Sequence, residues 1–344
     1  MRVVSGAVAQ PVFDHLYRMT DRRGVFEYAR HSDPQPDRGY CLDDISRALV
    51  VACREPGPSL ELQSLGRRLL AATLSGLRPD GLCYRRMTSD GAWNGVAGVG
   101  DSWGRALWGL GVSAVLAPTP ASRARALLGF RSAARHRSPH LRAMAFAALG
   151  AGELLAAHPD ELAARRLLLD AVAVLSDVAV DPTWPWPEPR LTHSNATIAE
   201  ALLVAGEALP DPAARSRGLY LLHFLLGIEV RHDHLSVTPV GGRGPSDLRP
   251  AFDQRPAEAA AIGAACAQAY ESTDDLHWLD GLEMSWAWFL GDNDAETPMF
   301  DQSAGAGFDG LQRDGRSPDQ GAESTLAALS TIQHVRRLVP LVGP

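Results

Sequence analysis

Apolar residues recur at helical spacing in at least eleven stretches of this chain, each bounded by Pro, Gly, Asp or Ser. Strand-like alternation is nearly absent, so the pattern predicts an all-α protein. Twelve helices are expected near residues 6–19, 41–54, 59–77, 101–116, 120–136, 139–157, 160–178, 194–208, 212–228, 256–271, 275–290 and 322–337.

The predicted helices alternate in character along the chain. Those that start near 41, 101, 139, 194, 256 and 322 are dense in Ala, Gly, Ser and Leu, which allows close helix approach and predicts an inner ring. Those near 59, 120, 160, 212 and 275 carry a polar stripe, as helices with one face in solvent do. With the first helix as the sixth outer member, the pattern predicts one (α/α)6 toroid domain, a six-hairpin barrel, over residues 1–344.

Composition removes several classes of partner. The 33 Lys and Arg residues against 40 Asp and Glu give a net charge of −7, so no basic surface for nucleic acid is expected. No run of eighteen apolar residues occurs and the N-terminal stretch is only weakly apolar, which predicts a cytoplasmic protein without membrane contact. The four cysteines show no CxxC spacing and are expected to be free thiols.

Unusual polar residues cluster at the predicted starts of the inner helices, which gather around one mouth if those helices run parallel. These candidates are Asp43, Asp44, Arg47, Asp101, Arg105, His193, Asn195, Asp253, Gln254, Glu258, Gln320 and Glu323. Aromatic and acidic residues on predicted loops add Trp93, Trp184, Trp186 and Glu188. Two long irregular stretches, 78–100 and 229–255, are of a length that is often functional in a compact domain.

Each candidate also has a structural interpretation. Asp44, Asp101 and Asp253 suit helix N-caps, the arginines suit ion pairs with neighbouring acids, and the loop tryptophans suit packing. Glu323 is harder to explain in this way, because it lies one turn into a helix of small and apolar residues, where burial of a carboxylate is costly.

Taken together, the candidates indicate carbohydrate chemistry. Carboxylates from several helices with aromatic rings above them suit a neutral polyol, and an acid–base pair can cleave an acetal. Asp101 and Glu323 are the first candidates for that catalytic pair, with Asp44, Asp253 and Glu258 in the same pool. Hydrolysis requires that one carboxyl is held protonated while another is ionised.

The order of short motifs along nearly the whole chain also carries a resemblance. The motifs include Gly39-Tyr40-Cys41, Asp43-Asp44, Arg47-Ala48-Leu49, Gly104 to Trp108, Trp184 to Glu188, Asn195-Ala196, Phe252-Asp253-Gln254, Asp309-Gly310-Leu311 and Gly321 to Leu326. With these motifs the chain resembles a group of bacterial six-hairpin glycosidase-like proteins that are often fused to, or encoded beside, family-four-type glycosyltransferases. The resemblance implies the (α/α)6 fold, carbohydrate metabolism and a glycosyltransferase encoded nearby as a partner.

The chain departs from that group's pattern at three positions. Ile45 stands where the group has Asn, Pro187 where it has Phe, and Arg255 is an insertion.

Three hypotheses on function follow. The leading one is a glycoside hydrolase with paired carboxylates that acts on an oligosaccharide or a small sugar, without a metal or cofactor. The second is a sugar epimerase or isomerase of the same fold, for which the available histidines are His31, His193, His223, His232 and His234. The third is a non-catalytic carbohydrate-binding module. A terpenoid cyclase is disfavoured, because the Asp43-Asp44 pair lacks the further aspartates that a magnesium diphosphate needs.

Overall fold

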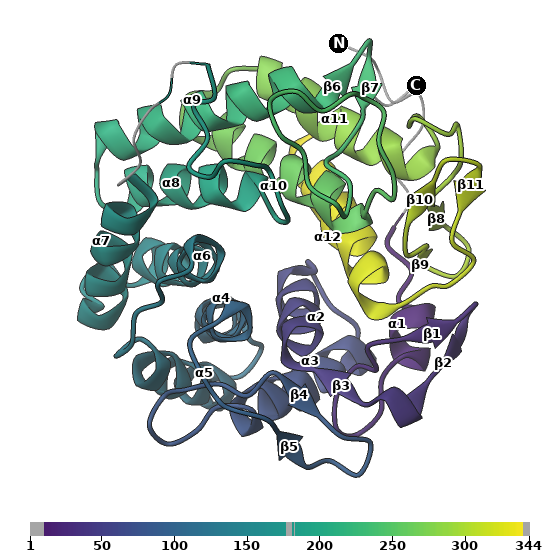
Figure 1. Cartoon of the computed structure of the whole chain (residues 1–344). Coiled ribbons are helices and arrows are strands. Elements are labelled where there is room, and N and C mark those ends of the chain that lie inside the picture. The colour runs from purple at the N-terminus through teal and green to yellow at the C-terminus, as the bar shows by residue number, and fades with distance from the viewer. Residues whose placement is uncertain (1–9, 177–180, 182, 340–344) are drawn as a thin grey trace.

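The computed structural model describes residues 10–176, 181 and 183–339, and its six inner helices close into a ring (Figure 1). These helices are α2 (Leu42–Arg54), α4 (Asp101–Leu116), α6 (Leu141–Ala157), α8 (Ala196–Ala208), α10 (Pro256–Thr273) and α12 (Ala322–Leu338). Each contacts the next, and α12 contacts α2 to complete the circle. The predicted (α/α)6 toroid is therefore confirmed.

The outer helices surround this ring. They are α1 (Asp14–Arg18), α3 (Leu60–Ser75), α5 (Pro120–Ala133), α7 (Leu162–Ser176), α9 (Pro212–Glu229) and α11 (His277–Leu290). Ser59, Thr119 and Asp211 begin three of them as N-caps, each accepting a hydrogen bond from a backbone N–H in the first turn. Within the described residues no helix combines the length and the apolar character that a bilayer crossing requires.

The first helix is shorter than predicted. The pattern predicted residues 6–19, but residues 10–13 are not helical and α1 begins at Asp14, while residues 6–9 lie outside the described part. Pro11 disfavours helical backbone at the residue before it, so a single helix over 6–19 is not favoured at this point.

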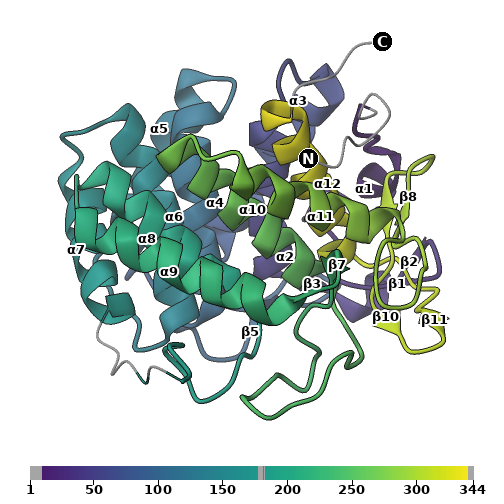
Figure 2. The same cartoon turned by 90° about the horizontal axis from the view of Figure 1, so that it is seen from above.

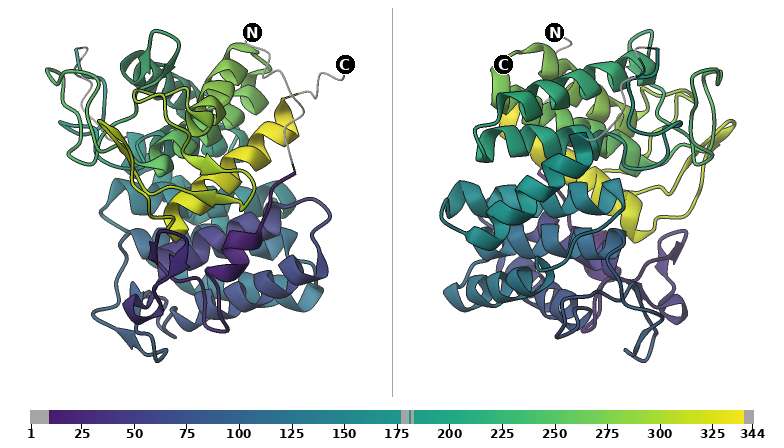
Figure 3. Two further views of the ribbon diagram at one scale, coloured as in Figure 1. Left: turned by 90° about the vertical axis from the view of Figure 1, so that its right-hand side faces the viewer. Right: turned by 60° about the vertical axis from the view of Figure 1, so that its left-hand side comes forward.

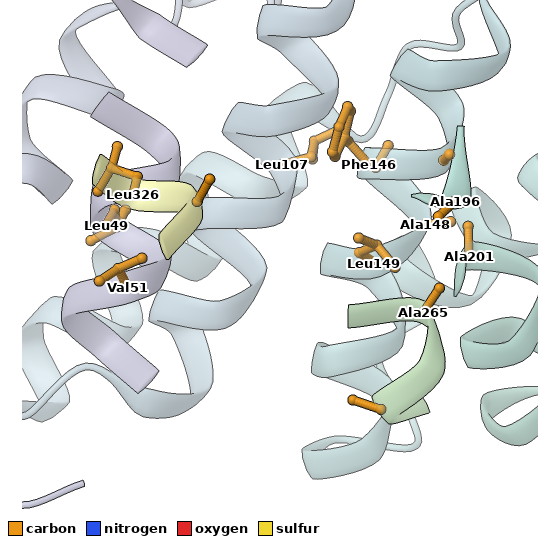
Figure 4. Close-up of a cluster of buried hydrophobic side chains, with 14 of the residues drawn as sticks. Leu49, Val51, Leu107, Phe146, Ala148, Leu149, Ala196, Ala201, Ala265 and Leu326 are labelled. Carbon is orange, nitrogen blue, oxygen red and sulfur yellow. The ribbon is translucent and has the colours of Figure 1, made fainter. Parts of the chain in front are cut away.

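Small residues bring the inner helices unusually close together. A Cβ atom at Gly104 of α4 would lie 2.2 Å from the carbonyl oxygen of Ala143 in α6, and one at Gly111 would lie 2.2 Å from that of Gly150. All six inner helices contribute apolar side chains to the core between them, as Figure 4 shows. The ring is held by this packing, which leaves its axis free for the cavities described below.

The described residues also form eleven strands of two residues each. They are β1 (Ala29–Arg30), β2 (Asp33–Pro34), β3 (Tyr40–Cys41), β4 (Arg86–Met87), β5 (Trp93–Asn94), β6 (Val230–Arg231), β7 (His234–Leu235), β8 (Phe300–Asp301), β9 (Ala306–Gly307), β10 (Leu311–Gln312) and β11 (Gly315–Arg316). All pairs are antiparallel, and β3, β4 and β5 form one three-stranded sheet. The strands gather towards one end of the ring (Figures 2 and 3), so that end carries the long connections.

Candidate functional site

A cavity of about 640 Å³ opens where the inner helices begin. It is lined by Asp43, Arg47, Cys83, Arg85, Val96, Gly98, Gly100, Asp101, Ser102, Trp103, Arg105, His140, His193, Arg255 and Glu323. We call it the mouth cavity. The starts of α2, α4 and α12 and the residues just before α6, α8 and α10 thus meet, as the parallel inner ring predicts.

The first pair in the mouth cavity joins Asp101 to His193. The His193 Nε2 atom lies 2.9 Å from Asp101 Oδ2, and the His193 side chain is 52% exposed. Burial opposes ionisation of Asp101, but the hydrogen bond from His193 and the charge of Arg105 bring its pKa below the ordinary value. An ionised carboxylate only accepts hydrogen bonds, so Nε2 carries a proton in this contact. The pair can therefore take up and return one proton.

The second group is Glu323, which Arg47 joins to Asp44. The Arg47 Nη1 atom lies 2.7 Å from Glu323 Oε2 and 3.0 Å from Asp44 Oδ1. Burial opposes ionisation of Glu323, yet the guanidinium groups of Arg47 and Arg105 hold its pKa at about 2. Burial raises the pKa of Asp44 to about 7, against the opposing charge of Arg47. Glu323, at 39% side-chain exposure, is thus a second ionised carboxylate of the cavity, whereas the Asp44 side chain is buried.

Arg105 links the mouth cavity to the core below it. Its guanidinium carbon stands 3.9 Å from the centroid of the Phe146 ring, and its Nε lies 3.6 Å from Asp43 Oδ2. Ser102 donates a further hydrogen bond to Asp43. Because an aromatic face and a carboxylate hold this buried cation, it places a fixed positive charge at the floor of the cavity.

Arg142 holds the segment that carries His193 in place through an ion pair and hydrogen bonds. Arg142 Nη1 and Nη2 each lie 2.7 Å from one carboxylate oxygen of Glu188, and Nη2 also donates to Asn195 Oδ1 at 3.0 Å. Arg142 Nε donates to the backbone oxygen of His193. Glu188 and Asn195 therefore position the histidine, and neither lines the mouth cavity.

Glu258 reinforces the same segment. Its Oε1 accepts a hydrogen bond from the Ser194 backbone N–H at 2.6 Å, and its Oε2 lies 3.4 Å from the backbone and side-chain nitrogens of Asn195. Burial raises the pKa of Glu258. It also borders a smaller side cavity of about 160 Å³ next to His193 and Arg255.

The three loop tryptophans predicted to cover a sugar serve packing instead. Trp184 and Trp186 are buried against Phe224 of α9, with ring centroids 5.3 and 6.3 Å apart. Trp93 donates from Nε1 to Ser75 Oγ at 3.1 Å. These three rings lie outside the lining of the mouth cavity.

Three further predicted residues also lie outside that lining. Asp253 is exposed. Gln254 is fully buried and donates to Asp294 Oδ2 at 2.7 Å. Gln320 is buried, and its backbone oxygen lies 2.8 Å from His15 Nε2. Gln254 and Gln320 therefore hold loops together.

The N-cap interpretation of the aspartates is wrong. No side-chain cap hydrogen bond occurs at the start of α2, α4 or α10, and Asp44 and Asp101 lie inside the first turns of α2 and α4. Their carboxylates face guanidinium or imidazole groups instead.

Sequence reasoning missed His140, Arg85 and Arg255 in the mouth cavity. His140 immediately precedes α6, in the same relation to its helix as the chosen candidates, so its position was a usable signal. Arg85 lies on the connection between α3 and α4, where hydrophobic periodicity does not indicate the direction in which a side chain points. Arg255 stood out only as an insertion in a motif.

One group of possible metal ligands lies near this site. Donor atoms of Glu27, Cys41 and Asp44 are within 4.8 Å of one another. Glu27, however, already accepts two hydrogen bonds from the Arg86 guanidinium, and burial raises the pKa of the Cys41 thiol well above its usual range. Both features disfavour a metal ion at this place.

A buried carboxyl group outside the site, that of Glu229, leads to a prediction of how stability depends on pH. Burial raises the pKa of Glu229 from its ordinary value of 4.5 to about 7, although its Oε1 accepts hydrogen bonds from the N–H and hydroxyl of Thr238. A raised pKa favours the folded state below about pH 4.5, and this contribution is lost as the pH rises through 7. We expect Glu229→Gln to match wild type near pH 4.5 and to gain about 1–3 kcal/mol over it at pH 8, measured by urea unfolding. A difference that shrinks as the pH rises would contradict this assignment.

Comparison with known proteins places the fold but not a family. No protein-family model matches the chain, and a search of curated proteins finds no match. Among solved structures, a sugar epimerase from a ruminal bacterium superposes with a TM-score of 0.73 at 12% identity over 96% of both chains. Cellobiose 2-epimerase from Bacillus thermoamylovorans gives 0.72 at 10% identity over 95% of this chain and 96% of that one. A GH76 α-mannanase from Bacteroides thetaiotaomicron gives 0.61 at 10% identity over 87% of each. At such identities the similarity establishes the (α/α)6 fold alone.

Proposed function

We propose that this chain is a carbohydrate-active enzyme that transfers a proton on a reducing sugar, as an epimerase or an isomerase does. The observation that carries this proposal is the pair of His193 and Asp101 in the mouth cavity. A histidine with one nitrogen hydrogen-bonded to a carboxylate, and with no hydrogen bond to the other nitrogen from the described residues, is suited to remove and return a proton.

The charges of the cavity favour this reaction. When a base removes the C2 proton of an open-chain aldose, the bonding electrons form a C1–C2 double bond and negative charge develops on O1. Arg47, Arg85, Arg105 and Arg255 line the cavity and would stabilise that charge. Return of the proton to C1, with transfer of the O2 proton to O1, gives the ketose.

Epimerisation would use a second group on the other face of C2. His140 is the further cavity residue that could supply it, since Glu323 is held ionised. Two proteins of similar structure are sugar epimerases by name, which supports a sugar as the substrate class. The sequence identity of 12% and 10% is low, so the substrate of this chain is itself part of the proposal.

Glycoside hydrolysis is the second candidate. Asp43, Asp101 and Glu323 bring three carboxylates to one cavity, and the similar α-mannanase is a hydrolase by name. The surroundings lower the pKa of both Asp101 and Glu323, so neither is held protonated as a general acid. His193 would have to donate the proton, which ranks this reaction below proton transfer on a free sugar. A glycosyltransferase that acts beside this chain stays a prediction from the sequence resemblance.

Isotope incorporation tests both candidates in one experiment. The purified protein is incubated with mannose, glucose, fructose, cellobiose and α- and β-linked manno-oligosaccharides, in D2O and separately in H2¹⁸O. We expect deuterium at C1 or C2 of a recovered sugar, detected by proton NMR. Cleavage with ¹⁸O at the anomeric carbon would replace this proposal by the hydrolase. Neither label, with sugar-dependent thermal stabilisation, would leave a binding module.

A further inference from the structure

A second cavity, of about 340 Å³, opens at the opposite end of the ring. Its lining includes Arg54 and Leu116, the last residues of α2 and α4, and Glu271 near the end of α10. We call it the distal cavity. Its size falls in the range of small-molecule sites in proteins.

Two largely buried residues turn polar side-chain atoms towards this cavity. Glu200 of α8 is 7% exposed and accepts no side-chain hydrogen bond within the described part of the chain. His334 of α12 is 9% exposed, and its one side-chain contact among the described residues is Nδ1 with Arg337 Nη2 at 3.3 Å. Both line the distal cavity. Their polar atoms without a protein partner are therefore open to the cavity, where they are free to bind a ligand.

The charged residues around these two side chains indicate the net charge and the hydrogen-bonding groups of such a ligand. Arg54 pairs with Glu153 at 3.3 Å and Arg337 pairs with Glu271, while Arg336 binds Glu55. The lining thus contains three arginines and three glutamates, Glu200 included, and carries no excess charge. Glu200 accepts hydrogen bonds and Arg54 donates them, a combination that hydroxyl groups satisfy because each can donate and accept.

We propose that the distal cavity binds a neutral polyol of about monosaccharide size. Glu200 and His334 receive its hydroxyl groups at the buried end, and the amide of Gln268 contacts it nearer the opening. Leu116 and Ala264 provide the apolar surface against which its carbon skeleton rests.

The distal cavity is a site separate from the mouth cavity. A narrow cavity of about 70 Å³ along the ring axis lies between them and shares Arg54, Glu200 and His334 with the one and Arg47, Arg105 and Glu323 with the other. Its wall is mostly apolar, with Val50, Leu149 and Leu326 among its residues. A hydroxylated ring finds few hydrogen bonds in that passage, so the two ends bind independently.

Calorimetric titration of the purified full chain with D-glucose, D-mannose and myo-inositol tests this proposal. We expect Glu200→Gln to weaken binding of at least one polyol about tenfold, and Gln268→Ala to weaken the same polyol. Glu207→Gln is the matched control, since Glu207 lies on the same helix but is 48% exposed in its side chain. Unchanged thermal unfolding shows that the variants are folded.

Two results would overturn the proposal. One is equal affinity of wild type and both cavity variants for all three polyols. The other is binding of methylammonium chloride that depends on Glu200 while the polyols do not bind. Turnover at the mouth cavity is measured separately, so failure of the proposed reaction leaves this test unaffected.

Discussion

Replacement of His193 by alanine is expected to reduce turnover by about 10²–10⁴-fold without loss of fold, because it removes the group that would transfer the proton. Asp101→Asn is expected to have a smaller effect of the same sign. The asparagine amide can still hydrogen-bond the imidazole, but it neither fixes the tautomer nor stabilises the charged ring. The measurement is steady-state kinetics on the substrate identified by isotope incorporation.

His158→Ala serves as the control for this experiment. His158 is an exposed histidine at the end of α6, far along the helix from the residues that line the mouth cavity. If His193→Ala and His158→Ala turn over the substrate at the same rate as wild type, the assignment of His193 as acid and base is wrong. The Asp101 and Glu323 carboxylates would then be the remaining candidates.

Replacement of Arg47 by methionine is expected to lower the free energy of unfolding by about 3–5 kcal/mol, the cost of removing one partner from a buried ion pair. Arg47 and Asp44 have side-chain exposures of 12% and 6%, so the orphaned Asp44 carboxylate would have no access to solvent as compensation. Urea unfolding at pH 8, above the pKa of about 7 for Asp44, measures the loss.

A second substitution distinguishes this cause from a loss of packing. We expect the double variant Arg47→Met with Asp44→Asn to recover a large part of the stability, since the buried Asp44 charge is then removed, while Glu323 keeps solvent access and the charge of Arg105. Arg67→Met on the outer helix α3 is the control, because Arg67 is exposed. A drop for Arg47→Met that Asp44→Asn does not relieve would show that the ion pair is not its source.

The fold could be predicted from the sequence because the residue composition of each helix indicates whether that helix is buried or partly exposed. Residues 139–157 are mostly small or apolar, and α6 is buried on nearly every side. In residues 160–178, by contrast, charged residues lie between the apolar ones, and α7 has an exposed face. The start of α1 could not be placed in this way. Its apolar residues fit helical spacing, but residues 10–13 are not helical in the structure.

The site was predictable only where it depends on helix starts. Asp101, Glu323 and Arg47 reach the mouth cavity because their helices begin there. Trp184 and Trp186 do not, since a loop position gives no information on whether a ring turns outward or folds back, and here Phe224 of α9 offers them an apolar surface. The sequence around a loop residue does not show which residue of a distant helix its side chain contacts.

The ion pair between Arg47 and Glu323 also constrains when the protein can become active during its synthesis. The two residues are 276 positions apart, on the first and last helices of the inner ring. Helices α2 to α10 can pack in pairs as they leave the ribosome, since each contacts its neighbour in the chain. The mouth cavity gains Glu323, and Arg47 its carboxylate partner across the seam, only when α12 has emerged. A chain without α12 therefore has an open arc, and the addition of α12 closes the ring and completes the lining of the mouth cavity.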